Sequence, residues 1–89
     1  MYKVVEDNDR IRILEGRGKP GTDIPLHSHP PCAVVFLNDC KLTTSSPDGK
    51  TETIDAHAGM VGFNAEAFEH SGKVLGDNEA HFFVIELKK

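Results

Sequence analysis

Short apolar segments separated by turn signals about every 8–12 residues constrain this chain more than any other feature. The clearest turn is Ser-Pro-Asp-Gly-Lys at residues 46–50, where Pro presets φ and Gly accepts a positive φ. This turn predicts a hairpin between strands at residues 41–45 and 51–55. No segment has the 3.6-residue period of an amphipathic helix, so we expect an all-β protein.

The other apolar segments complete a pattern of roughly nine short strands. We expect strands at residues 2–5, 10–14, 33–37, 60–63, 68–75 and 81–87, and one more through residues 27 and 29. The continuous apolar run 33–37 predicts a strand buried on both faces, and the Gly-rich residues 16–21 predict a loop. Such a pattern is typical of a sandwich or barrel, and we interpret it as a small antiparallel β-barrel.

The length of 89 residues predicts one domain, residues 1–89. A chain this short buries a small core, so a bound metal or a partner subunit would increase its stability. The strand at residues 2–5 would leave an exposed edge on an isolated barrel. We therefore expect a homodimer in which a partner sheet covers that edge.

Charge and hydropathy exclude two classes of partner. The net charge is −4 and no basic stripe is present, which argues against nucleic acid binding. No apolar run approaches the roughly 18 residues of a membrane span, and the N-terminal residues lack the apolar region of a signal peptide. We expect a cytoplasmic protein, in which Cys32 and Cys40 are thiols rather than a disulfide.

The segment His27-Ser28-His29 has the form of a metal site built on a strand. Side chains two apart on a strand point to the same face, so both imidazoles can enter one cavity. Two imidazoles leave a first-row metal under-coordinated, and His70, brought alongside by strand pairing, is the candidate third ligand. The alternative is that these histidines are exposed loop residues or are buried with neutral hydrogen bonds.

At these residues the chain resembles the cupin family. The first cupin motif is a Gly, five residues, His-x-His, three or four residues, Glu, six residues and Gly. Gly21, His27 and His29 match it, whereas Ala33 stands at the position of the Glu and Cys40 at that of the closing Gly. The histidines therefore match where the motif's Glu does not.

The second cupin motif matches in the same partial way. It consists of a Gly, five residues, Pro-x-Gly, two residues, His and, four positions on, Asn. Gly59 and His70 fit this spacing, with Ala65, Ala67 and Val74 at the other three positions. The resemblance covers essentially the whole chain and implies a double-stranded β-helix, or jelly roll.

The resemblance implies that His27, His29 and His70 bind one divalent transition metal, namely Fe, Ni, Zn, Mn or Cu. Imidazole ligands suit most of these ions. Cupins with three His and no Glu include iron-dependent dioxygenases of thiols and diketones. We expect a metal-dependent, dioxygenase-like enzyme acting on a small polar metabolite. The alternatives are a metal- or ligand-binding module without turnover, such as a sensor, and a metal-free domain; the sequence alone leaves open whether the chain is an enzyme.

Several further residues have candidate roles near the site. Cys32 would approach the metal if the prolines before it bend the strand, although a buried apolar Cys is the simpler interpretation. Glu66 and Glu69 could support His70 or remain solvated. His57 and His81 are expected on the surface. The phenylalanines are expected in the core and cavity wall: Phe36, Phe63, Phe68, Phe82 and Phe83.

Overall fold

The computed structural model describes residues 1–88, which form nine strands and no helix, and hence no membrane-spanning helix. The all-β prediction is confirmed. The strands are β1 (Tyr2–Asp7), β2 (Ile11–Gly18), β3 (Asp23–His29), β4 (Cys32–Phe36), β5 (Cys40–Ser45), β6 (Thr51–Ala56), β7 (Val61–Asn64), β8 (Phe68–Leu75) and β9 (Ala80–Leu87).

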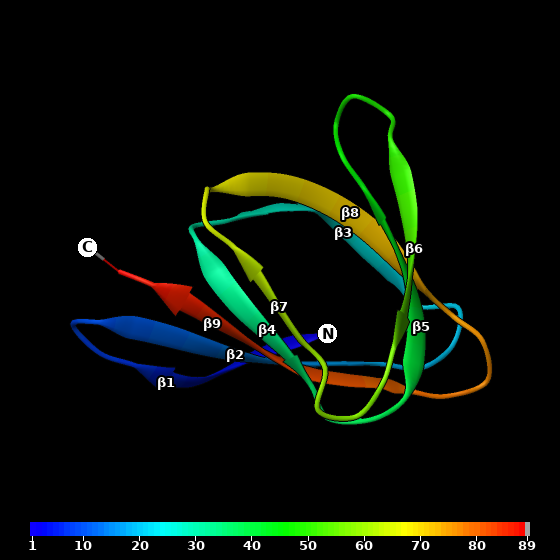
Figure 1. Cartoon of the computed structure of the whole chain (residues 1–89), viewed down its shortest axis with the longest axis horizontal. Coiled ribbons are helices and arrows are strands. Elements are labelled where there is room, and N and C mark those ends of the chain that lie inside the picture. Colours follow the sequence, from blue (N-terminus) through cyan, green and yellow to red (C-terminus); the bar gives the residue numbers. More distant parts are fainter. Residues whose placement is uncertain (89) are drawn as a thin grey trace.

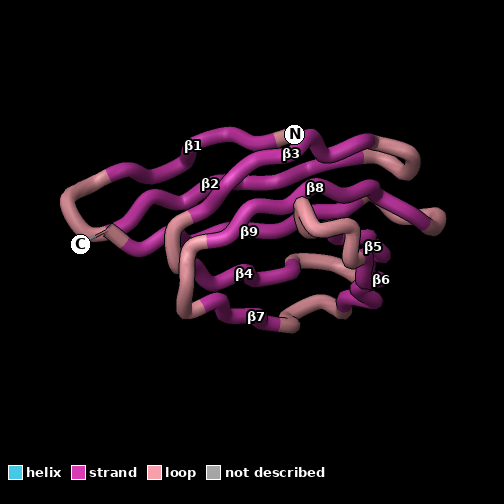
Figure 2. The backbone as a smooth tube through the Cα atoms, turned by 90° about the horizontal axis from the view of Figure 1, so that it is seen from above, coloured by secondary structure: helices cyan, strands magenta, loops and turns pink. Residues whose placement is uncertain are grey.

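The strands form two sheets that face each other across the barrel (Figures 1 and 2). One sheet has five strands in the order β1-β2-β9-β4-β7, and the other has four in the order β3-β8-β5-β6. All pairings given by the strand registers are antiparallel. The predicted hairpin, β5 with β6, extends beyond the other strands at its turn (Figure 1).

The Gly-rich segment 16–21 differs from its predicted loop. Its first three residues continue β2, because β2 pairs with β9 residue by residue as far as Gly18 opposite Ala80. Gly16 is required there, since the Phe82 ring lies 2.6 Å from the place where a Cβ would stand. The glycine therefore makes room for a core aromatic ring within a strand, and the turn begins only after it.

Strand β9 lies between β2 and β4 in the five-stranded sheet and defines the barrel interior. Its residues alternate between buried and partly exposed, so that Ala80, Phe82, Val84 and Glu86 point inward. The first three of these pack in the apolar core. The other buried members of this core are Leu14, Cys32, Phe36, Cys40, Leu42, Ala56 and Val74.

The prediction that residues 33–37 are buried on both faces is wrong for one face. Cys32 and Phe36, at the two ends of β4, are buried, whereas Ala33 and Val35 on its outer face are partly exposed. Strand pairing explains the difference: β4 has neighbours on both edges, β9 and β7, but no described element covers its outer face. Ala33 and Val35 therefore belong to the outer surface of the five-stranded sheet rather than to the core.

Candidate metal centre

The structure brings His27, His29 and His70 together, as the motif spacing predicts. His27 and His29 point to the same side of β3, and His70 lies on β8 directly opposite His27 in the strand register. One potential ligand atom from each ring lies within 4.8 Å of the other two. His29 is buried, and the other two rings are partly exposed.

The hydrogen bonds of His27 and His29 turn both Nε2 atoms toward one point. His27 Nδ1 donates to the carbonyl oxygen of Pro25 at 2.7 Å, and His29 Nδ1 donates to Glu86 Oε2 at 2.7 Å. In neutral rings this leaves a lone pair on each Nε2. The two Nε2 atoms are only 2.8 Å apart. Two lone pairs at this distance repel each other unless they share a cation, either a metal ion or a proton.

His70 completes the group with an unsatisfied nitrogen. Its Nδ1 hydrogen-bonds Thr44 Oγ1 at 3.0 Å, while its Nε2 is buried and has no hydrogen-bond partner among the described residues. Burial, followed by the nearby charges of His27 and His29, lowers the pKa of His70 to about 4. The ring is therefore neutral near pH 7, the form in which imidazole binds a metal.

These observations fit a bound metal ion. Each of the three rings uses Nδ1 for a partner in the protein, and Nε2 is left for the ion. A tetrahedral ion at about 2.0–2.1 Å from each nitrogen would hold the nitrogens about 3.3–3.4 Å apart, so a pair at the 4.8 Å limit would have to close by about 1.4 Å. The donor set, three imidazole rings, suits a first-row transition metal.

Glu86 is one of two residues at the site that the sequence analysis did not predict. It is only 2% exposed and accepts hydrogen bonds from His29 Nδ1 at Oε2 and from Arg12 Nε at Oε1, the latter at 2.7 Å. Arg12 Nη2 adds an ion-pair contact with Oε1 at 2.6 Å. Its signal in the sequence is its position, since it continues the inward-facing series of β9 after Val84. A charged residue on the buried face of a strand requires a partner.

Tyr2 is a second missed residue. Its hydroxyl lies 3.5 Å from His27 Nε2, and its ring meets the rings of His27 and His29 edge to face. Burial, with smaller effects of Cys32 and Glu86, raises its pKa to about 12, so the phenol keeps its proton. The sequence carries no signal for this role, because Tyr2 reaches the site only through the pairing of β1 with β2.

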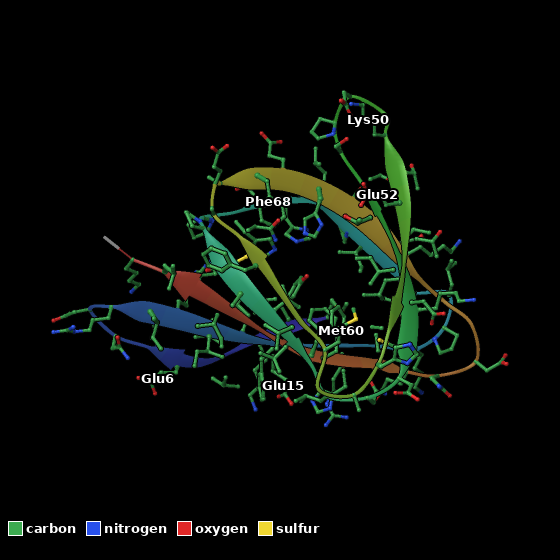
Figure 3. The ribbon with its side chains drawn as sticks, in the orientation of Figure 1. Glu6, Glu15, Lys50, Glu52, Met60 and Phe68 are labelled. Atoms are coloured by element: carbon green, nitrogen blue, oxygen red, sulfur yellow. The ribbon has the colours of Figure 1, made fainter. Side chains whose placement is uncertain are left out.

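The histidines adjoin a cavity of about 500 Å³ inside the barrel. His29 and His70 line it, and Glu52, Met60 and Phe68 border its opening in Figure 3. Most of the remaining wall is apolar, formed by Ile24, Cys32, Val34, Phe36, Leu42, Ile54, Phe82 and Val84. The cavity therefore combines a polar metal-ligand cluster with an apolar enclosure.

The structure changes the interpretation of the motif's Glu position. Cys32 and Val34 line the cavity, whereas Ala33 lies between them on the outer face of β4. A Glu at residue 33 would consequently point away from the histidines. Cys32 does face the interior, opposite Glu86 in the register, but it does not belong to the group of clustered ligand atoms. Both Cys32 and Cys40 are free and buried, as predicted.

The remaining candidates divide between the site and the surface. His57 is 71% exposed beside Asp39, and His81 pairs with Glu15 on the outer side of β9, so neither joins the cluster, as expected. Glu69 lines the cavity, whereas Glu66 is exposed and does not. Of the phenylalanines, Phe36, Phe68 and Phe82 line the cavity; the prediction is wrong for Phe63 and Phe83, which lie on the outer face.

Comparison with solved structures identifies the fold. A cupin domain from Bordetella pertussis Tohama I superposes with a TM-score of 0.90 at 29% identity, covering 100% of this chain and 93% of that one. An RmlC-like cupin with a double-stranded β-helix fold from Methanocaldococcus jannaschii superposes with a TM-score of 0.80 at 11% identity, covering 99% of this chain and 79% of the other. No protein-family model and no curated protein matches the chain.

Fold and site together define a double-stranded β-helix protein with a histidine cluster in its barrel. The chain has the fold of the cupin domains with which it superposes. The site assembles residues from both cupin motifs, because His27 and His29 come from the first and His70 from the second.

Proposed function

We propose that the protein is a metal-dependent enzyme that holds one divalent transition metal through His27, His29 and His70 and acts on a small molecule bound in the cavity. The observation that carries this proposal is the cluster of one potential ligand nitrogen from each ring within 4.8 Å, with every Nδ1 engaged in a hydrogen bond. An ion held by three imidazoles keeps positions open for substrate, and iron there would supply oxygenase chemistry. The two free thiols support a reducing compartment such as the cytoplasm.

The cavity wall narrows the class of substrate. The sequence analysis expects a small polar metabolite, and the mainly apolar lining favours one whose polar atoms are gathered at the end that meets the metal. Tyr2, which keeps its proton, can donate a hydrogen bond to that polar end. The apolar residues would enclose the rest of the molecule and exclude water from it.

Metal content of protein purified without a His tag tests the metal site. We expect about one metal per chain, and replacement of any of the three histidines by Ala should abolish stoichiometric binding because two imidazoles hold a divalent ion weakly. His57→Ala is the matched control, since this exposed histidine lies outside the cluster. Full occupancy in the His70→Ala variant would contradict the three-histidine site.

A binding module without turnover is the second candidate function. The groups that hydrogen-bond the three rings are Pro25 O, the Tyr2 hydroxyl, Thr44 Oγ1 and Glu86, and the Glu86 carboxylate is already shared with Arg12. None of these is free to act as a general base. Oxygen uptake by the iron-loaded protein, measured with a panel of thiols, diketones and hydroxy acids, separates the two functions. Uptake no faster than that of free iron would support the binding module.

We also propose that the chain forms a weak homodimer through the outer face of its five-stranded sheet. The edge strand β1 is a poor pairing surface, because a bulge between Val4 and Glu6 interrupts its register. The outer face instead presents apolar side chains from β2, β9, β4 and β7: Ile11, Ile13, Ala33, Val35, Val61, Phe63, Phe83 and Ile85. Of these, Val61 and Phe63 are each 62% exposed.

The size of this face suits a second copy of the chain. Four strands spaced about 4.8 Å apart, with about seven residues each at about 3.4 Å, cover about 450 Å². Two copies would bury about 900 Å² of flat area, which corresponds to a weak dimer rather than an obligate one. A face of this kind is self-complementary about a two-fold axis, since apolar side chains meet their own equivalents.

A further inference from the structure

We infer that Glu86 is a positioning residue for the metal ligand His29, an inference that rests on the proposed metal site. Its carboxylate fixes the orientation of the His29 ring and determines which of the two ring nitrogens carries the proton. Glu86 is the one charged side chain on the buried face of β9. Glu86 is 2% exposed on the inner face of β9, where Ala80, Phe82 and Val84 form the apolar core. A buried carboxylate there is costly unless it is paired.

The partners of Glu86 divide its two carboxylate oxygens between them. Arg12 contacts Oε1 through Nε and Nη2, and its side chain is 42% exposed, so its charge reaches from the solvent-exposed surface to the buried carboxylate. His29 binds Oε2, and both partners of this bond are almost completely buried. Because a carboxylate only accepts hydrogen bonds, Nδ1 of His29 carries the proton and Nε2 presents its lone pair to the site.

The other two histidines lack such a partner. His27 Nδ1 donates to a backbone carbonyl, and His70 Nδ1 meets the hydroxyl of Thr44. A charged acceptor increases the basicity of the opposite nitrogen more than a neutral one does. His29 is therefore the strongest of the three donors, anchored by a group from the opposite sheet, and Glu86 contributes to metal binding without touching the ion.

The test compares two Glu-His pairs in the same chain. Glu86→Gln should weaken the binding of Co²⁺ or Zn²⁺, titrated as the metal alone, by about 10- to 100-fold. Glu15→Gln is the matched control, because Glu15 also binds a histidine, His81, at 2.7 Å beside an arginine, but outside the cavity. This control should change the metal affinity less than twofold. An equal effect of the two variants would overturn the inference.

A spectroscopic measurement keeps the inference testable if Glu86→Gln does not fold. Nitrogen NMR of the imidazoles in the metal-free wild type should show His29 with its proton on Nδ1. A proton on Nε2 of His29 would contradict the role of Glu86, whatever the variants do. Failure of the wild type to bind metal would instead refute the proposed function and leave this assignment of the tautomer standing.

Discussion

The two sheets of the barrel contribute different residues to the candidate metal site. The four-stranded sheet carries all three histidines, on β3 and β8, whereas the five-stranded sheet carries Glu86 on β9 and Tyr2 on β1, which hold and flank them. The three rings are brought together by the pairing of β3 with β8 within one sheet, where Pro25 and Thr44 also hold His27 and His70. Closure of the barrel adds Glu86 and Tyr2 from the other sheet.

The outer faces of the two sheets differ as strongly as their inner faces. The outer face of the five-stranded sheet is apolar except where Glu15, Arg17 and His81 pair with one another. The four-stranded sheet presents mainly polar side chains from β5, β6 and β8, among them Lys41, Thr43, Thr53, Asp55 and Lys73. One sheet thus presents a surface suited to water, and the other carries the face on which the homodimer is proposed.

The largest expected effect concerns the packing of the histidine-bearing sheet. A Cβ at Gly72 on β8 would lie 2.1 Å from the carbonyl oxygen of Thr43, so Gly72→Ala must separate two paired strands. We expect the free energy of unfolding, measured by urea denaturation, to fall by about 3 kcal/mol. Gly62→Ala on β7 is the control, because nothing lies within 4 Å of its Cβ position. Similar stabilities of the two variants would show that the two sheets tolerate added bulk equally.

The contrast between the sheets also explains which features the sequence predicts. Turn residues and apolar segments predict strand positions well, and β8 has the predicted bounds, Phe68–Leu75. The histidine cluster is also predictable, because side chains two apart share a face and His70 lies opposite His27. These features depend on local spacing within one strand or on the pairing of two.

Features that depend on distant pairing are not predictable in this way. Glu86 meets Arg12 because β9 pairs with β2, across 74 positions of the sequence. The face on which Ala33 lies depends on how the chain passes from β3 to β4 through two prolines, where a shift of one residue reverses every side chain. The motif spacing therefore aligned Ala33 with the Glu of the first cupin motif, whereas the strand register places its side chain on the outer surface.

A substitution at Ala33 distinguishes the role of the outer face in assembly from the role of the cavity in metal binding. Ala33→Glu should leave the metal content unchanged, because the side chain points away from the histidines. It should weaken the proposed dimer at least tenfold, since it buries a charge in an apolar contact. Light scattering at tens of micromolar measures the dimer. Thr53→Glu adds the same charge to the outer face of the other sheet and should have no effect on assembly. A monomeric wild type under these conditions would reject the dimer.

The smallest expected effect is the pH dependence of the metal-free protein. Because the pKa of His70 falls from 6.5 in the unfolded chain to about 4 in the folded one, the unfolded state binds more protons between these values. Stability from the neutral ring is complete above about pH 6.5 and is lost as the pH falls toward 4. After allowance for partial exposure, the loss between pH 7 and pH 5 should be about 1 kcal/mol. His70→Gln should remove that part of the slope in urea denaturation, whereas His57→Gln, on an exposed ring, should retain it. Equal slopes in the two variants would show that burial in the four-stranded sheet does not set the protonation of His70.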